Sequence, residues 1–431
     1  GCIELTTYLK DIKAHLGDDV LLGCDHYWQL GPSWPQNNPT PQRLIMHYTS
    51  CELLRILGFP PCVLEFQYGT IGNWLRVTQE ELRVALMAHL GFGLQGHNGY
   101  IFSGGPNHGG FTGKTYDYCA PIAADGTIRP HYYSIKEQGD FIRDYPELLN
   151  TVADTKIRVL MDWNIMRGAC KDAPEANSSE GYSSMHRYLY SGAIGTALTS
   201  GFMPTLVNPD DDAWERDIST PLMVFSGGVM ERKVQQRLVE YLHSGGNILF
   251  KGVLPFLDER YNSCSIIADA LGVTNRRNLC IGRAANAILE FGGEDRPYNS
   301  GPLYGLEKLP EDAVVIATED YSCVPVAAEM RLGAGRIIVD GSLFSLEHHS
   351  HAEWFCFEAA RLGAQAAWHG NNPWILPLLR ISPDGADRWL FLVNAGASTE
   401  TIDWHYDAEA TVNVQLPAMS VAVFKNSHRV F

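Results

Sequence analysis

Glu65 is the residue of this chain best suited to chemistry. It follows the apolar run Cys62–Leu64, and the residues after it are rich in glycine and aromatic side chains. Barrel enzymes keep their catalytic groups at the C-terminal ends of buried strands, in loops of this kind. An unpaired charge beside Val63 and Leu64 would also be costly to bury without a function. Cleaving a glycosidic bond needs two carboxyl groups, and Glu65 is suited to be one of them.

Polar and aromatic side chains gather after three predicted strands. Aromatic faces stack on the apolar face of a sugar, while carboxylates, amides and phenols bind its hydroxyl groups, so this mixture favours a carbohydrate site. We predict that Glu65 is catalytic. The residues predicted to bind substrate are Asp25, His26, Tyr27, Trp74, Asn98, Tyr100, Asn107 and Tyr118.

Each cluster also has a purely structural interpretation. The tryptophans, including Trp28 and Trp34, could be half-buried at the rim of the fold. Asp25 could cap a helix or pair with an arginine. His26 and His97 could be hydrogen-bonded core histidines rather than groups that contact a ligand. The residues alone leave these alternatives open.

Alternating helices and strands position the clusters within a predicted first domain, residues 1–148. Apolar spacing predicts helices over residues 5–16, 41–57 and 78–91, with strands over 19–25, 62–65 and 93–102. Thr78 and Glu81 match a capping box, and Gly91 ends the third helix. Three such units are too few to close a (β/α)8 barrel, so part of the barrel is missing from these residues.

The rest of the chain predicts two further domains. Over residues 149–371, short apolar strands alternate with helices, which favours a mainly parallel sheet covered on both faces and a flavodoxin-like α/β domain. Over residues 372–431, period-two alternation predicts a small antiparallel β-sandwich. The predicted strands cover 157–161, 221–225, 247–250, 314–317 and 336–339 in the second domain, and 389–394, 412–416 and 420–424 in the third.

Composition excludes several classes of partner. A formal net charge of −16 without any basic run argues against nucleic acid and against an anionic membrane surface. Ten cysteines without C-x-x-C spacing favour reduced core residues in a cytoplasmic protein. No apolar run is long enough to span a membrane. The N-terminus has neither an initiator methionine nor the layout of a signal peptide, so we expect the sequence to be an internal part of a longer protein.

No cofactor or metal is expected. His348, His349 and His351 form a short run typical of an exposed turn, and no second ligand cluster is visible near it. The middle domain has no G-x-S-x-G or G-x-C-x-G elbow, which disfavours an amidotransferase-like hydrolase. Gly227 and Gly228 precede a helix but have no phosphate-binding fingerprint around them.

The stretch from residue 100 to residue 135 resembles the glycoside hydrolase family 35 β-galactosidases. That family carries Y-x-F-x-G-G-T-N-F-G, then S-Y-D-Y-D-A-P, then K-Y-Y-x-L, and this chain follows the same order and spacing. The resemblance implies galactose contacts at Tyr100 and Tyr118. It implies that Glu65 is the nucleophile at the end of the seventh barrel strand, with strands six and eight on either side. The departures from the family pattern are Pro106, His108, Cys119 and His131.

Residues 149–371 are similar instead to the trimerisation domain of family 42 β-galactosidases, a degenerate glutaminase-like unit followed there by a small β domain. This second resemblance implies a homo-oligomer. Taken together, the chain resembles the C-terminal part of a retaining β-galactosidase in the clan of (β/α)8-barrel glycosidases. The expected substrate is a terminal β-galactoside.

In that clan, the acid/base is a glutamate that follows an asparagine, and this sequence contains no Asn-Glu pair. We therefore expect a double displacement in which Glu65 is the nucleophile. The acid/base would come from the N-terminal half of the barrel, as a separate or cleaved chain. The alternative is a non-catalytic sugar-binding or assembly subunit of a glycosidase complex.

Overall fold

The computed structural model of the chain describes most of its residues in two compact units. The described ranges are 10–28, 42–69, 77–106, 115–165, 188–279, 285–291, 294–300, 303–344, 349–366, 375–407 and 410–431. The first unit comprises Leu16–Asp154 and Trp368–Phe431. The second comprises Thr155–Ala367 together with the described part of Cys2–His15. Among the described residues, no helix combines the length and the apolar character that crossing a membrane requires.

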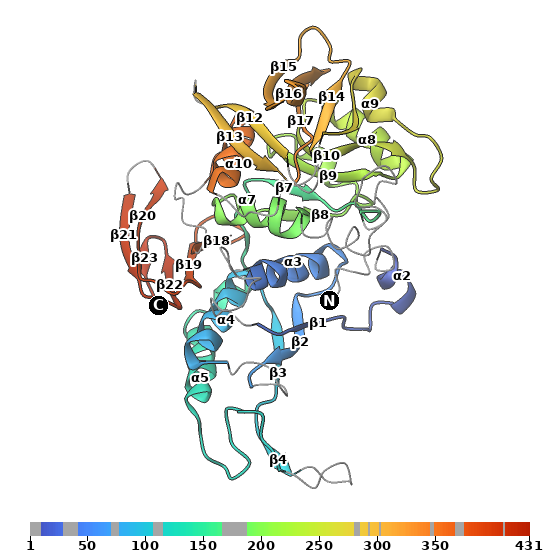
Figure 1. Cartoon of the computed structure of the whole chain (residues 1–431). Helices are drawn as coiled ribbons and strands as arrows, with labels where there is room; N and C mark the ends of the chain where they lie inside the picture. The colour runs from blue at the N-terminus through green and yellow to red at the C-terminus, as the bar shows by residue number, and fades with distance from the viewer. Residues whose placement is uncertain are drawn as a thin grey trace. The chain divides into compact units, whose positions relative to one another are not determined.

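The first unit contains a parallel sheet of three strands in the order β1-β2-β3 (Figure 1). The strands are β1 (Cys24–His26), β2 (Cys62–Gln67) and β3 (Gly96–Tyr100). Helix α3 (Gln42–Ile56) connects the first two strands, and α4 (Gln79–Gly91) connects the second two. Parallel neighbours need such crossover connections, so the predicted alternation of helix and strand is confirmed here. The first strand is shorter than predicted, and of the predicted first helix the structure describes α2 (Ile12–Leu16).

Helix α4 begins as the sequence predicts. The backbone N–H of Glu81 donates to Thr78 Oγ1 at 3.1 Å, and the N–H of Thr78 donates to Glu81 Oε2 at 2.8 Å. These two bonds form the reciprocal capping box, which satisfies donors that the first helical turn leaves free. The helix is buried along most of its length.

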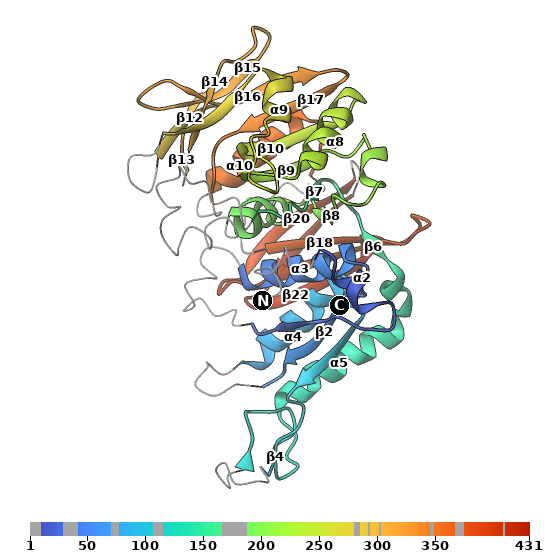
Figure 2. The ribbon, with the colours of Figure 1, turned by 90° about the vertical axis from the view of Figure 1, so that its right-hand side faces the viewer.

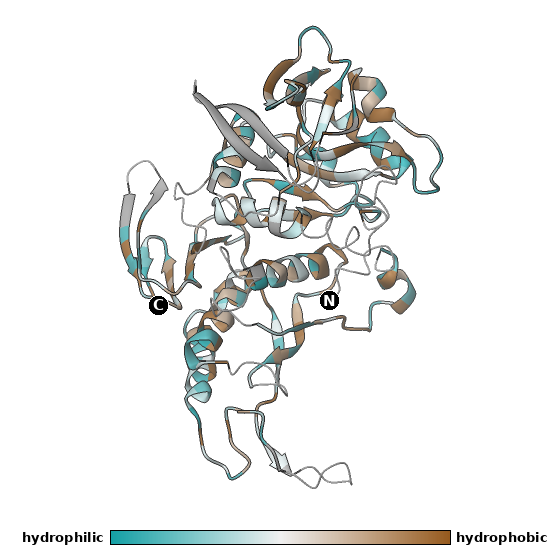
Figure 3. Ribbon diagram, in the orientation of Figure 1, coloured by the Kyte–Doolittle hydropathy of each residue, from teal (hydrophilic) through white to brown (hydrophobic). Residues whose placement is uncertain are grey.

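Helix α5 (Pro130–Asp144) packs beside α4 through polar contacts. Gln138 donates to the backbone oxygen of Leu86 at 2.9 Å, and Arg83 pairs with Glu137 at 2.6 Å. Figure 3 shows α5 as largely hydrophilic, which agrees with its small buried face of Ser134, Gln138 and Phe141. A short hairpin of β4 (Gly105–Pro106) and β5 (Thr115–Tyr116) precedes this helix.

A five-stranded antiparallel sheet completes the first unit, in the order β23-β22-β19-β18-β6. The antiparallel structure predicted for the end of the chain is thereby confirmed. Its strand β6 comes from the segment that follows α5. Arg380, buried on β18, donates to Oγ1 of Thr151, the residue before β6, at 2.8 Å. The strands are β6 (Val152–Ala153), β18 (Ile375–Ile381), β19 (Arg388–Asn394), β22 (Ser420–Lys425) and β23 (His428–Arg429); β20 (Glu400–Asp407) and β21 (Ala410–Leu416) form a separate pair.

The second unit is built on a nine-stranded sheet in the order β13-β12-β15-β16-β17-β10-β9-β7-β8. Figure 2 shows the β12–β13 hairpin at one end of this sheet. The five strands from β17 to β8 are parallel. The strands are β7 (Arg158–Leu160), β8 (Thr205–Val207), β9 (Leu222–Val229), β10 (Asn247–Leu257), β12 (Ala285–Phe291), β13 (Glu294–Ser300), β15 (Val314–Glu319), β16 (Pro325–Leu332) and β17 (Gly335–Asp340).

The prediction of a mainly parallel sheet is wrong for the other end of this sheet. There β17, β16, β15, β12 and β13 pair antiparallel. The physical reason is the length of the connections, because β16 and β17 are joined by a tight turn at Gly333, where φ is +61°. Such a turn has no room for the crossover that a parallel pair requires.

Helices of the second unit pack on this sheet. The amphipathic spacing of residues 231–243 predicts a helix, which the structure has as α8 (Arg232–His243). Its buried Val234, Leu238 and Tyr241 belong to the same core cluster as the sheet residues Val224 and Ile248. The remaining elements described in this unit are η4 (Tyr188–Ile194), α7 (Gly195–Thr199), η5 (Trp214–Arg216), α9 (Ile266–Leu271), β11 (Thr274–Asn278), β14 (Tyr304–Glu307) and α10 (His349–Arg361).

Candidate functional site

Glu65 lies within β2 rather than at its end, because the strand continues to Gln67. This corrects the predicted strand boundary. The side chain is half-buried, and in the parallel pairing Asp25 of β1 is its direct partner across the sheet. Neighbouring parallel strands in register carry the side chains of paired residues on the same face, which brings the two carboxyl groups together.

Asp25 and Glu65 share a hydrogen bond between their side chains. Partial burial, and then the charge and hydrogen bond of Glu65, raise the pKa of Asp25. A retaining glycosidase places its nucleophile and its acid/base about 5 to 5.5 Å apart. Two carboxyl groups in hydrogen-bond contact are much closer than that, so Asp25 does not have the spacing of the acid/base.

Tyr27 follows β1 and donates a hydrogen bond from its phenol to Glu65. Burial, and then this bond and the charge of Glu65, raise the pKa of Tyr27 strongly. The phenol therefore keeps its proton at neutral pH and remains a donor. Tyr100, at the end of β3, lies close enough to contribute electrostatically to the same phenol. The predicted residues Asp25, Tyr27 and Tyr100 thus all come together around Glu65.

Tyr118 reaches the same region through its backbone. A Cβ at Gly69 would lie 2.3 Å from the carbonyl oxygen of Tyr118, so the chain at Tyr118 packs directly against the turn after β2. Asn98 is exposed on β3, and its side chain donates to the backbone oxygen of Leu64 at 3.2 Å. Trp74 and Asn107, also predicted to bind substrate, lie outside the described residues, as does Trp34.

His26 differs from the prediction that it binds substrate. Its side chain is 1% exposed, and its two ring nitrogens contact Cys24 Sγ at 3.0 Å and His89 Nε2 at 2.7 Å. The alternation of side chains along β1 is the reason, since Asp25 faces outward between two buried neighbours. The alternative of a hydrogen-bonded core histidine therefore describes His26.

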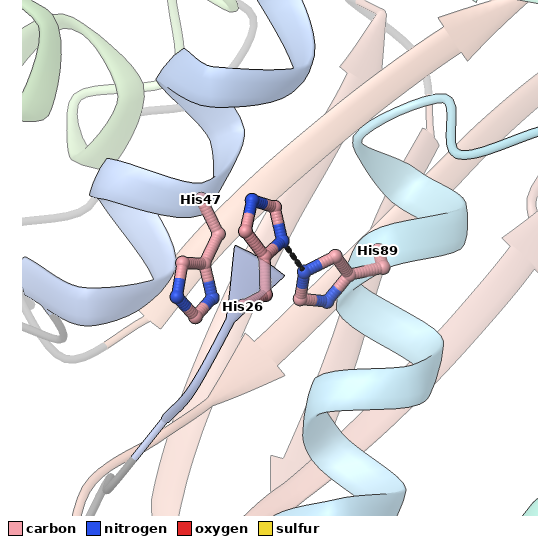
Figure 4. Close-up of side chains that lie close together, drawn as sticks. All are labelled: His26, His47 and His89. Carbon is pink, nitrogen blue, oxygen red and sulfur yellow. Dashed lines mark hydrogen bonds between the residues drawn. The ribbon is translucent and has the colours of Figure 1, made fainter. Parts of the chain in front are cut away.

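Two further histidines join His26 in the core, and sequence reasoning missed them (Figure 4). His47 of α3 stacks on the His26 ring with centroids 4.1 Å apart, and His89 comes from α4. Burial lowers the pKa of all three, that of His89 to about 3, so their rings are neutral at neutral pH. Helical spacing was the available signal, because His47 shares a face with the apolar Leu44 and Cys51.

The arrangement around Glu65 suits a nucleophile that is held in place. The carboxyl group is hydrogen-bonded by the phenol of Tyr27, which follows β1, and by the carboxyl group of Asp25. Tyr100 of β3 lies near that phenol, and the backbone of Tyr118 packs against the turn after β2. Hydrogen-bonding partners that lock a reacting group in one rotamer reduce the cost of reaching the transition state.

Replacing Tyr27 by phenylalanine is expected to lower kcat/KM of the full-length protein about 10- to 100-fold, because one hydrogen bond to a charged group contributes about 1.5–3 kcal/mol. Steady-state kinetics would measure the change. Tyr133→Phe is the matched control, since Tyr133 is 57% exposed on α5. Equal kinetics for wild type and Tyr27→Phe would show that the phenol does not act through Glu65.

Comparisons with known proteins agree with a glycosidase-like fold. Residues 215–286 match a family model described as the second domain of GLMA-like proteins. The chain is 29% identical over 232 residues to an exo-β-D-glucosaminidase of Pyrococcus horikoshii, covering 51% of this chain and 29% of that protein. It is 27% identical over 342 residues to an exo-β-D-glucosaminidase of Thermococcus kodakarensis, covering 74% and 41%. The chain thus spans less than half the length of these relatives.

Among solved structures, the chain is similar to Gan42B, a GH42 β-galactosidase from G. stearothermophilus. The TM-score is 0.75 at 14% identity, and the match covers 97% of this chain and 60% of that one. A likeness at this identity shows the fold alone. The predicted α/β class is therefore confirmed, and the predicted layout as part of a barrel followed by two further domains stays a prediction.

Proposed function

We propose that the chain carries the nucleophile half of the active site of a retaining β-glycosidase. The observation that carries this proposal is Glu65, hydrogen-bonded by Asp25 and by Tyr27, with Tyr100 near the Tyr27 phenol. An oxygen of Glu65 bonds to the anomeric carbon while the bond from that carbon to the leaving oxygen breaks. Water then cleaves the glycosyl-enzyme ester and releases the sugar with its original anomeric configuration.

The acid/base would come from the N-terminal half of the barrel, present elsewhere in the protein or as a separate chain. Strand β1 is an edge strand of the three-stranded sheet, and Leu21 (50% exposed) and Leu64 (43% exposed) lie at or near it. An open parallel edge with exposed apolar side chains beside it is what further barrel strands would cover. A homo-oligomer is part of the same proposal and rests on the resemblance of the middle domain to a trimerisation domain.

Two sugars are candidates for the terminal residue of the substrate. A β-galactoside follows from the resemblance at Tyr100 and Tyr118. A β-glucosaminide is favoured by the carboxyl pair of Asp25 and Glu65, because a cationic amino sugar gains attraction from two acidic groups. The exo-β-D-glucosaminidases among the relatives support this second candidate. The alternative of a non-catalytic sugar-binding or assembly subunit predicts no turnover of either sugar.

The test uses the full-length protein with aryl β-galactoside and aryl β-glucosaminide in parallel, and follows the anomeric configuration of the released sugar by NMR. We expect hydrolysis of at least one substrate with retention of configuration, and the ratio of the two kcat/KM values identifies the sugar. Inversion of configuration would overturn the mechanism. Absence of hydrolysis with both substrates would favour the non-catalytic alternative.

A further inference from the structure

His26, His47 and His89 form a cluster of three buried histidines on three different elements. Each side chain is 6% exposed or less, and one ring nitrogen of each lies within 4.8 Å of a ring nitrogen of each of the others. Neutral imidazole is the form that ligates metals, and burial keeps these rings neutral.

In two of the three rings, the nitrogen that points away from the cluster donates a hydrogen bond to a backbone carbonyl. His89 donates from Nδ1 to the backbone oxygen of Ala85 at 2.6 Å. His47 donates a ring N–H to the backbone carbonyl of Tyr27, and because its Nδ1 has no hydrogen-bond partner, the donor is Nε2. Metal-binding histidines almost always donate their second ring N–H to a backbone carbonyl or a similar acceptor in this way.

His26 can also donate its second ring N–H away from the cluster if its proton moves from Nδ1 to Nε2. Its Nδ1 now donates to His89 Nε2 at 2.7 Å, since His89 uses its own proton for Ala85. Its Nε2 lies 3.0 Å from Cys24 Sγ, and that thiol is also 3.6 Å from the carbonyl oxygen of Cys62. If Cys24 donates to Cys62, His26 can carry its proton on Nε2 and donate to the sulfur. The Nδ1 lone pair is then free.

The result is three nitrogen lone pairs within one buried space: Nδ1 of His26, Nδ1 of His47 and Nε2 of His89. Figure 4 shows the rings grouped between β1 and the two helices, with one nitrogen of His47 on the side of its ring that faces the others. Without an ion, the Nδ1 of His47 is a buried acceptor with no partner, which is costly.

We propose that His26, His47 and His89 bind one zinc ion. Zinc–nitrogen bonds of about 2.0–2.1 Å in a tetrahedral site place the ligand nitrogens roughly 3.4 Å apart. The nitrogens of His26 and His89 must therefore separate by roughly 0.7 Å from their hydrogen-bonded distance of 2.7 Å. One ring nitrogen of each histidine lies within 4.8 Å of one ring nitrogen of each of the others, so nitrogens at that separation must approach by no more than roughly 1.4 Å.

Bound zinc would tie β1 to both helices behind the candidate nucleophile. His26 lies between Asp25 and Tyr27, the two residues that hydrogen-bond to Glu65. The ion is a structural ligand in this proposal. Its presence is tested by metal content, which does not depend on the sugar chemistry proposed above.

The experiment uses the full-length protein, purified without an immobilised-metal column, stripped with a chelator and then titrated with zinc alone. Mass spectrometry of the metal should find about one zinc ion per chain, because the three histidines form a single site. Cobalt in its place should give the visible absorption of a tetrahedral nitrogen site. His47→Ala should weaken zinc binding at least tenfold, and Cys24→Ala, which keeps all three ligands, about 10- to 100-fold.

His15→Ala is the matched control, because His15 is exposed on α2, and it should bind zinc as the wild type does. Wild-type protein that takes up no zinc and gives no cobalt spectrum would overturn the proposal. Equal zinc affinity for wild type and His47→Ala would also overturn it. If His47→Ala fails to fold, Cys24→Ala and the cobalt spectrum of the wild type decide the question.

Discussion

Replacing Glu65 by alanine is expected to lower kcat of the full-length protein about 1000-fold or more, because loss of a nucleophile removes the covalent step. Glu65 is the group on which the contacts from Asp25 and Tyr27 converge. Azide, a small anion that can take the place of the missing carboxylate, should restore turnover and give a glycosyl azide of inverted configuration. Steady-state kinetics and NMR of the product would measure both effects.

Glu80→Gln is the matched control for this experiment. Glu80 is an exposed carboxylate in the first turn of α4, and its replacement should leave kcat unchanged. A Glu65→Ala variant that keeps wild-type activity would refute the role of nucleophile. A variant that is inactive but not rescued by azide would indicate that Glu65 has a positioning role instead.

Replacing Lys251 by methionine is expected to lower the free energy of unfolding by about 3–5 kcal/mol, because it leaves a buried charge without its partner. Lys251, on β10, is 1% exposed and contacts both Asp340 and Glu358, the latter at 2.5 Å. Burial disfavours the charged form of Asp340, but the charge and hydrogen bond of Lys251 prevail and lower its pKa. Urea unfolding at pH 7 would measure the loss.

Glu358→Gln tests how the charge is shared within this cluster. Burial raises the pKa of Glu358 well above its usual value, which favours the protonated carboxyl group as a hydrogen-bond donor to Asp340. A raised pKa contributes stability that is fully present below the unfolded value of 4.5 and is lost as pH rises through the folded value. Glutamine should therefore change stability at pH 7 by less than about 1 kcal/mol.

Equal losses of unfolding free energy for Lys251→Met and Glu358→Gln would contradict a protonated Glu358. Such a result would mean that Glu358 is ionised and that it depends on the charge of Lys251 to the same extent as Asp340. A stabilised Lys251→Met variant would contradict the ion pair itself. Lys233→Met is the control for loss of a lysine, since Lys233 is exposed on α8.

Local chemistry predicted several of the elements correctly. The capping box of Thr78 and Glu81 starts α4, and the apolar spacing of α3 and α8 agrees with their observed bounds. These signals act over a few residues, so the predicted helix forms wherever tertiary packing does not oppose it. The direction of strand pairing in the second unit was not predictable in this way, because a short buried strand has the same apolar sequence pattern in a parallel and in an antiparallel sheet.

The sequence by itself determined the candidate nucleophile and the chemical character of its surroundings. Glu65 stands out because a carboxylate after an apolar run is an unusual local pattern, and Tyr27 and Tyr100 because they belong to the polar and aromatic clusters of the predicted strands. Only the tertiary structure decided that Asp25 bonds to Glu65 and that His26 joins His47 and His89 instead of facing a sugar. The physical reason is that such contacts depend on strand register and helix packing, which bring together residues up to 63 positions apart. Contacts between such distant residues produce no periodic pattern in the sequence.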